Sequence, residues 1–281
     1  MTLQERGAPR AAWVERLGSR DPLTTAGDFV RKTLVVVEVE MRKLRHDSTE
    51  VISRAAQPAL WLLVFGQVMN QMRAIPTGGL PYIDFLAPGI LAQSVLFIAI
   101  FYGIAIIWER DLGIVQKFLV SPAPRTAQVL GKGLAAGVRA LAQALIIYAL
   151  AALMGVDLNW NPLALLGVAA VVVCGAAVFS LFSLLVACLV KTRERFMGFG
   201  QVMTMPLFFA SNAIYPVSLM PSWLQVIARL NPLTYEVDAL RALMLRGGTS
   251  VYGVGMDLLV LVGIAAVLAV AGGRLYPNVV T

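Results

Sequence analysis

The sequence is poor in charged residues, in cysteine and in histidine, and each shortage excludes a class of protein or site. Charged residues occupy 14% of the 281 positions, whereas about a quarter is usual in a soluble domain. The two cysteines, Cys174 and Cys188, lie in one apolar run, about 21 Å apart along a helix and far beyond disulfide reach. The single histidine, His46, leaves no cluster for a histidine-containing metal site. An ordinary soluble domain, an intrachain disulfide and a histidine metal site are therefore excluded.

The sequence is instead rich in long apolar runs, since hydrophobic residues make up 58% of it. Six runs approach the roughly 20 residues that a membrane-spanning helix needs. They cover residues 55–72, 85–108, 134–154, 163–190, 197–214 and 251–272. Pro58 and Pro88 are expected in the first turn of their spans, where the missing N–H costs little, and Pro206 is expected to kink the fifth span. We predict an all-α membrane protein with six transmembrane helices within residues 55–281.

Basic residues are distributed unequally between the two sides of this topology. Nineteen of the 23 Lys and Arg residues lie on the side that holds both chain termini. Because basic residues resist translocation, this side is expected to be the cytoplasm. The formal net charge of +7 then suits the anionic cytoplasmic leaflet better than a nucleic acid.

The segment before the first span divides into two parts. Residues 1–24 have no recognisable pattern and are expected to form a variable cytoplasmic tail. In residues 25–54, apolar side chains recur at three- and four-residue steps with basic residues between them. This spacing predicts an amphipathic helix on the membrane interface, with a soluble coiled-coil segment as the alternative. Glu38 and Glu40 interrupt the most apolar early stretch, so no secretory signal is expected.

Residues 109–125 combine a short amphipathic helix with an abrupt break. Leu112 and Phe118 share one helical face with other apolar residues, and Pro122 and Pro124 cannot continue the helix. Two explanations stay open for this pattern. The segment is either a docking surface for another protein, or its basic charge serves membrane topology alone.

Residues 215–248 form the longest stretch between spans and are unexpectedly apolar. The pattern predicts one helix from Ser222 to Leu230 and a second over 233–246, with a break at Asn231 and Pro232. Each helix is too short to cross a membrane, so the pair is expected to dip into the outer leaflet. Acidic and basic side chains at helical spacing are expected to pair: Glu236 and Asp238 with Arg241 or Arg246.

Few polar residues lie within the spans, and each has two interpretations. Asp257 is about seven residues into the sixth span, where an acid is a functional candidate by default. Alternatively, the span begins after Gly255 and leaves Asp257 at the wet interface. Other polar, Met and Phe side chains either line a substrate path or provide ordinary helix packing. The candidates for a path or gate are Gln93, Gln143, Phe179, Phe182, Met203, Phe208, Phe209 and Asn212.

Catalytic and nucleotide-binding motifs are absent from the sequence. Gly131 and Lys132 lack the upstream glycine and the following Ser or Thr of a phosphate-binding loop, so Lys132 is not expected to bind phosphate. There is no H-E-x-x-H or C-x-x-C motif and no chain of carboxylates suited to a proton relay. We therefore expect no catalytic residue and no metal, and any transport would draw its energy from elsewhere.

Three groups of short motifs occur together in this chain. The first group is Glu109-Arg110-Asp111-x-Gly113, Leu119-Val120-Ser121-Pro122-x-Pro124-Arg125 and Leu130-Gly131-Lys132. The second is Pro206-Leu207-Phe208-Phe209-x-Ser211-Asn212 with Tyr215-Pro216. The third is Met220-Pro221-x-Trp223-Leu224, Asn231-Pro232-Leu233-Thr234-Tyr235 and Asp238-x-x-Arg241. In this combination, from Arg42 to the C-terminus, the sequence resembles ABC-2 type permeases, in particular the daunorubicin-resistance-like drug export permeases of bacteria.

The resemblance implies an interfacial connecting helix, six transmembrane helices and a coupling helix in residues 109–125 that docks on a separate ATPase subunit. The implied docking residues are Glu109, Arg110, Asp111, Gly113, Lys117, Pro122, Pro124 and Arg125. The implied residues of external re-entrant helices are Trp223, Asn231, Pro232, Tyr235, Asp238 and Arg241. Two permease copies would pair with two ATPase copies, which use ATP and Mg. The family also implies the bacterial inner membrane and export of a hydrophobic or amphiphilic small molecule.

Three other functions remain as alternatives. An ABC-2 exporter of polysaccharide or lipid-linked glycan would be expected to line its path with aromatic rings, whereas these spans are mainly aliphatic. A secondary transporter would need internal repeats and a buried ion site, for which Asp257 alone is a poor candidate. A membrane scaffold would leave the external helix pair and the kinked fifth span without a purpose.

Overall fold

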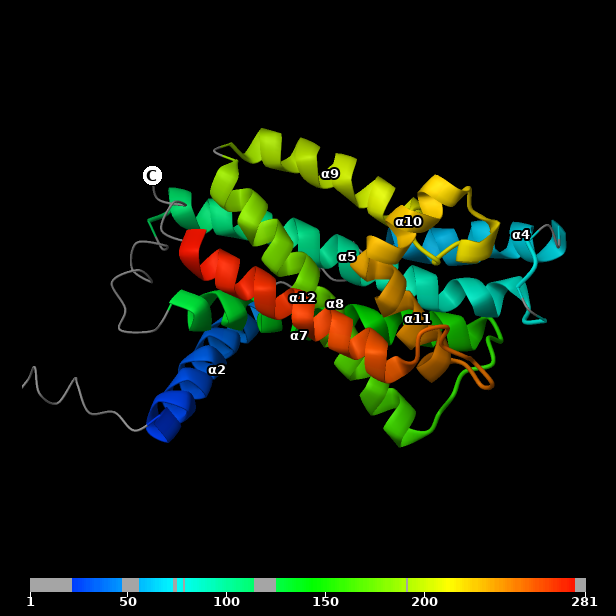
Figure 1. Cartoon of the computed structure of the whole chain (residues 1–281), viewed down its shortest axis with the longest axis horizontal. Helices are drawn as coiled ribbons and strands as arrows, with labels where there is room; N and C mark the ends of the chain where they lie inside the picture. The colour runs from blue at the N-terminus through cyan, green and yellow to red at the C-terminus, as the bar shows by residue number, and fades with distance from the viewer. Residues whose placement is uncertain are drawn as a thin grey trace, which may run out of the picture.

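The computed structural model describes residues 22–46, 56–72, 75–77, 79–113, 125–190 and 192–275. Within these ranges the chain is almost entirely helical and has no strand, apart from an isolated bridge between Leu158 and Leu245. The helices form an elongated bundle (Figure 1). The predicted tail of residues 1–24 lies almost wholly outside the described residues.

The elements follow one another in a simple order along the chain. They are α2 (Pro22–His46), η1 (Trp61–Gly66), α4 (Gln67–Met72), α5 (Tyr82–Asp111), α7 (Arg125–Leu153), α8 (Pro162–Leu189), α9 (Arg193–Phe209), η2 (Val217–Leu219), α10 (Ser222–Leu230), α11 (Pro232–Met244) and α12 (Val254–Leu275). Of these, η1 is a π-helical segment and η2 is a 3-10 turn. The helix pair α10 and α11 meets at Asn231, where the sequence analysis places a break.

Four helices in the described part of the chain are long and apolar enough to cross a membrane. They are α5, residues 126–153 of α7, α8 and α12. The other two expected spans are also helical but shorter. Residues 56–72 and α9 each contain 17 helical residues. A helix of this size is about 26 Å long, whereas the hydrocarbon core of a membrane is about 30 Å thick. The six-span topology therefore stays a prediction.

Some helix boundaries differ from those expected from the apolar runs. The second span begins at Tyr82, so Pro88 lies inside α5 rather than in its first turn. The third begins at Arg125, nine residues before the apolar run, so Lys132 is a helical residue. The reason is that apolar periodicity detects the membrane-facing length of a helix, whereas helices also extend into polar sequence.

Asparagine side chains fix the starts of two helices. The Asn161 Oδ1 atom accepts a hydrogen bond from the Leu163 N–H at 3.0 Å, and Asn231 Oδ1 does the same for Leu233 at 3.0 Å. In both helices a proline occupies the first helical position. The side chain satisfies one of the free amides of the first turn, and the fixed proline φ favours the helix.

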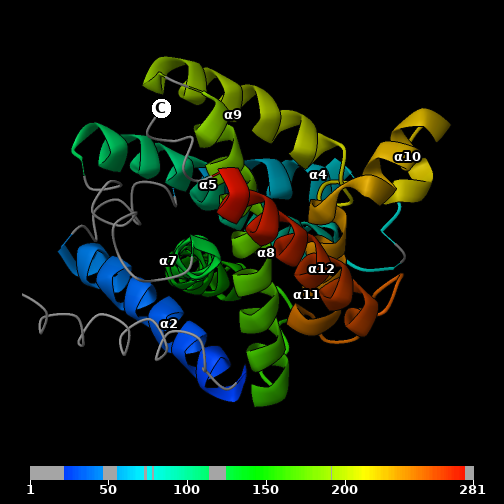
Figure 2. The same cartoon turned by 60° about the vertical axis from the view of Figure 1, so that its left-hand side comes forward.

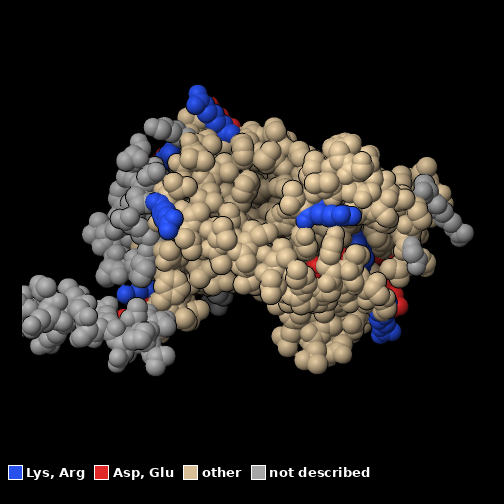
Figure 3. Space-filling model, viewed as in Figure 1, with Lys and Arg blue, Asp and Glu red and all other residues tan. Residues whose placement is uncertain are grey.

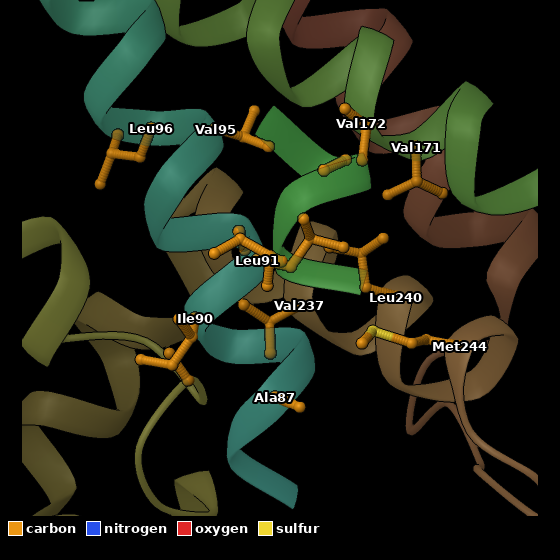
Figure 4. Packing of buried hydrophobic residues seen from close by; sticks show 14 of the residues in the cluster. Ala87, Ile90, Leu91, Val95, Leu96, Val171, Val172, Val237, Leu240 and Met244 are labelled. Atoms are coloured by element: carbon orange, nitrogen blue, oxygen red, sulfur yellow. The ribbon is translucent and has the colours of Figure 1, made fainter. Parts of the chain in front are cut away.

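Helix α8 is at the centre of the bundle, with α5, α7, α11 and α12 packed against it (Figure 2). The buried cluster at this junction joins side chains from α5, α8 and α11 (Figure 4). Its labelled members are Ala87, Ile90, Leu91, Val95, Leu96, Val171, Val172, Val237, Leu240 and Met244. Close packing of this kind holds helices together where lipid removes the usual hydrophobic driving force.

Small residues allow the closest helix approaches. A Cβ atom at Gly103 of α5 would overlap the Ser183 hydroxyl of α8 and lie 2.6 Å from the Phe196 ring. A Cβ atom at Gly137 of α7 would lie 2.9 Å from the Val173 side chain. These glycines are therefore required by packing, as in other membrane helix pairs.

Helix α2 lies beside α7 at one end of the bundle (Figure 2). Four apolar side chains of α2 are exposed: Val30, Leu34, Val35 and Val39. Thr33 on the same helix is buried, and its hydroxyl donates to the Phe29 carbonyl at 2.9 Å. The exposed apolar face is suited to contact with lipid.

Candidate functional site

The first part of the predicted docking segment is the end of helix α5. Glu109, Arg110 and Asp111 form its last turn, and Gly113 follows with a φ of +70°, a left-handed conformation that favours glycine at a helix end. Residues 114–124 lie outside the described residues, and with them Lys117, Pro122 and Pro124. Arg125 is the first residue of α7.

Glu109 is buried and forms an ion pair with Lys132 of α7. The Lys132 Nζ atom donates to Glu109 Oε2 at 2.5 Å. The Lys132 side chain is 2% exposed and that of Glu109 is 9% exposed. This explains how a lysine is tolerated inside the bundle, because a buried charge needs a partner. It also shows that the carboxylate of Glu109 is engaged within this chain.

Asp111 is connected to α9 through Arg193. The Nη2 and Nε atoms of Arg193 donate to Asp111 Oδ2 at 2.7 and 3.0 Å. Arg110 donates to the other oxygen, Oδ1, at 3.2 Å. The Arg193 guanidinium also lies over the Trp108 ring, 3.9 Å from its centroid. The last turn of α5 is thus bonded to both α7 and α9.

At the opposite end of the bundle, Asp238 of α11 holds the loop that leads into α12. Its Oδ2 atom accepts hydrogen bonds from the Ser250 hydroxyl at 2.9 Å and from the backbone N–H groups of Val251 and Tyr252 at 2.7 and 3.1 Å. The Ser250 hydroxyl also lies 2.8 Å from Asp257 Oδ2. Asp257 is in the first turn of α12, and its side chain is fully buried within the protein.

Arg241 connects α11 to the start of α5 instead of forming the expected acid–base pair. Its Nη2 atom donates to the backbone carbonyl of Asn212 at 2.8 Å, and its guanidinium lies 3.8 Å from the centre of the Phe85 ring. Burial lowers the pKa of Arg241 to about 10, so it stays protonated at neutral pH. Arg246 instead lies 3.7 Å from Asp157.

Glu236 is the most deeply buried acid of α11. It is fully buried against Gly175 of α8, and both carboxylate oxygens lack a hydrogen-bond partner in the part of the chain that the structure describes. Burial raises its pKa well above the ordinary value, because removal from water disfavours the charged carboxylate. Among the described residues, neither Glu236 nor Asp238 forms a salt bridge with Arg241 or Arg246. Asp238 and Arg241 bind backbone groups instead, and Glu236 packs against α8.

The eight candidate path residues do not share one cavity in the described structure. Gln93, Gln143, Phe179 and Phe208 are buried within the helix bundle. Phe182 is partly buried in a smaller cluster near Phe196. The remaining three, Met203, Phe209 and Asn212, line two separate pockets.

Two of the pockets are grooves beside α9. One, of about 550 Å³, lies between α9 and α10 and is almost wholly apolar; it includes Met203, Phe209 and the exposed Trp223. The other, of about 490 Å³, is lined by Gln57, Pro58, Phe97, Phe101, Met197, Gln201 and Met205. Most of this second set was not predicted, because one sequence does not show which span packs beside which.

A third pocket, of about 450 Å³, lies at the α10–α11 end and is lined by Asn212, Asp238 and Arg241 among others. Charged residues are few on the face shown in Figure 3 and lie toward the two ends of the molecule, leaving its middle uncharged. This distribution is that of a protein whose middle contacts lipid.

The sequence model of the ABC-2 type transporter family matches residues 31–245, which include all of α5 to α11. The chain belongs to the ABC-2 type transporter family. The part outside this ABC-2 match contains the start of α2 and the last span, α12.

Individual relatives support the same assignment. The chain is 28% identical over 262 residues to the daunorubicin resistance ABC transporter permease DrrB1 of Streptomyces coeruleorubidus, covering 93% of this chain and 90% of that protein. It is 29% identical to a protein named as a transport permease, ycf38, of Cyanophora paradoxa, over 76% of this chain and 74% of the relative. It is 24% identical to a protein named as a doxorubicin resistance permease, DrrC, of Mycobacterium tuberculosis, over 86% and 87%. ABC-2 permeases are transmembrane subunits that work with a separate ABC ATPase.

Proposed function

We propose that this chain is the permease subunit of an ATP-driven exporter of hydrophobic or amphiphilic small molecules, such as drugs, antibiotics or lipid-like compounds. The observation that carries the proposal is the similarity to the daunorubicin resistance permease, which extends over nearly the full length of both chains. The relatives named for resistance to daunorubicin and doxorubicin favour an amphiphilic aromatic substrate over a glycan.

In this proposal the protein has six spans in a bacterial inner membrane, with both termini in the cytoplasm. Two copies assemble with two ATPase subunits, which bind ATP and Mg. The end of helix α5 and the following residues up to 125 dock on the ATPase, and α10 and α11 are re-entrant helices in the outer leaflet. The uneven distribution of Lys and Arg supports this orientation.

The apolar grooves beside α9 are the proposed substrate-facing surfaces. Their linings combine methionine and aromatic side chains, which adapt to ligands of varied shape. The groove between α9 and α10 lies against the exposed rings of Phe209 and Trp223. Such a surface would favour flat apolar molecules, because aromatic rings stack on one another.

Affinity purification from the native host in mild detergent tests the ATPase partnership. We expect an ABC ATPase to be recovered in equal amount with the wild-type chain, and to be lost when residues 109–125 are replaced. Recovery of the chain alone, repeated after gentle cross-linking and in lipid nanodiscs, would refute ATP coupling. Retention of both ATPase and transport after Ala replacement of Glu109, Arg110 or Asp111 would show that these side chains are not the docking contacts.

A further inference from the structure

The last turn of α5 is bonded to two other helices at the point where the chain enters the proposed docking segment. Glu109 pairs with Lys132 of α7, and Asp111 pairs with Arg193 at the start of α9. The two acids are two residues apart, so they point to different sides of the helix. Helix α5 thus joins α7 and α9 at the end of the bundle that carries Gly113.

The two ion pairs differ in their surroundings. The Glu109–Lys132 pair is buried, so salt screens it little and breaking it is costly. The side chains of Arg193 and Asp111 are 39% and 36% exposed. The exposed pair is reinforced by a second hydrogen bond from Arg193 and by its contact with Trp108. The first pair holds the end of α5 to α7, and the second holds it to α9.

The docking segment is joined to the membrane helices at both ends, through the last turn of α5 and through Arg125, the first residue of α7. If the end of α5 were held only by packing, it could tilt or unwind locally without moving α7 and α9. Because charged hydrogen bonds hold it to both helices, the three ends move as one unit. The contact of α8 with both α5 and α7 then extends the motion into the centre of the bundle.

We propose that Glu109, Lys132, Asp111 and Arg193 form a clamp that transmits ATPase movement from the docking segment to α7 and α9. This inference rests on the proposed function and names the positioning residues of the same docking region. It narrows the docking contacts proposed for residues 109–125: the side chains of Glu109 and Asp111 make contacts within the chain, and other residues of the segment contact the ATPase. The clamp therefore controls coupling, whereas ATPase binding depends on other residues.

The experiment uses the full complex with its ATPase in nanodiscs. A single cysteine at Leu145, an exposed position of α7, carries an environment-sensitive dye in a Cys174→Ala/Cys188→Ala background. The fluorescence change caused by ATP with vanadate reports movement of α7, and ATP hydrolysis is measured in the same sample. We expect the Glu109→Gln variant to retain the bound ATPase and the rate of ATP hydrolysis. The amplitude of the fluorescence change should fall at least about fivefold.

The charge-exchanged variant Glu109→Lys/Lys132→Glu is expected to recover most of the fluorescence change. Glu194→Gln, which removes an exposed acid of α9, is the matched control and should behave as wild type. If Glu109→Gln fails to fold, Asp111→Asn tests the exposed half of the clamp and should reduce the change in the same way.

Loss of ATPase recovery in Glu109→Gln, with no recovery by charge exchange, would overturn the clamp and identify Glu109 as a docking contact. An unchanged fluorescence response in both Glu109→Gln and Asp111→Asn would also overturn it. Absence of an ATPase from the wild-type preparation would instead refute the proposed function, and the clamp with it. The wild-type recovery and the variant responses therefore separate the two failures.

Discussion

The buried Glu109–Lys132 pair makes a stability prediction that is separate from coupling. Lys132→Met would break the buried ion pair with Glu109, and breaking a buried pair by removing one partner costs roughly 3–5 kcal/mol. With a shift of roughly 2–4 °C per kcal/mol for chains of this size, the apparent Tm should fall by about 6–20 °C. Replacement of both residues, as Glu109→Met/Lys132→Met, should restore most of this loss because two apolar side chains need no partner.

The assay is thermal unfolding of the purified chain followed by tryptophan fluorescence, with Glu194→Gln as the control. The double variant should be stable but should lose the fluorescence change caused by ATP with vanadate. Apolar packing can replace the buried charges, but it cannot replace the directed hydrogen bonds between the helices. A double variant less stable than either single variant would refute the reasoning. A Lys132→Met variant as stable as wild type would show that the pair contributes little to the fold.

Three further predictions concern packing, protonation and capping. Gly103→Ala should reduce the amount of folded protein in the membrane because its Cβ would overlap neighbouring side chains, whereas Gly263→Ala, with open space around it, should not; immunoblots of membrane fractions would measure both. Burial raises the pKa of Glu236 above its ordinary value of 4.5, so the folded protein holds this proton more tightly than the unfolded chain and stability should fall as pH rises above that value; Glu236→Gln should flatten the dependence of Tm on pH above 4.5, and an unchanged slope would contradict this. Asn231→Ala should cost roughly 1–3 kcal/mol and lower the Tm more than Asn161→Ala, because the Asn231 amide also donates to two backbone carbonyls; equal losses would show that those two bonds contribute nothing.

The apolar runs predict where the long helices lie, but not every helix boundary. The run 163–190 corresponds to α8 over Pro162–Leu189, and 251–272 corresponds to α12 over Val254–Leu275. Helix α8 has no charged residue, and α12 has charged residues only in its first and last turns, so composition alone marks their ends. The third helix begins at Arg125 because its first turns are polar and pack against other helices, which hydropathy does not register.

Contacts between distant residues were not predictable from the spacing of residues along one helix. Asp238 and Arg241 are three residues apart, the spacing of a surface pair, but the backbone of Val251 and Tyr252 binds the first, and the backbone of Asn212 binds the second. Likewise, Lys132 has its partner 23 residues away in the chain. In the sequence, Glu109 and Lys132 both belong to motifs of the family resemblance. These motifs were the available signal that the two residues matter, but they did not show what the residues contact.

The central claim is that this chain moves amphiphilic molecules with energy from a partner ATPase. The most direct test uses proteoliposomes that contain both subunits and a fluorescent anthracycline such as daunorubicin. ATP is supplied only to the side of the membrane that carries the ATPase. The account predicts ATP-dependent movement of the compound away from the ATPase side, lost when either subunit is omitted. Movement that proceeds equally without ATP or without the ATPase, or that follows an imposed proton gradient instead, would contradict it.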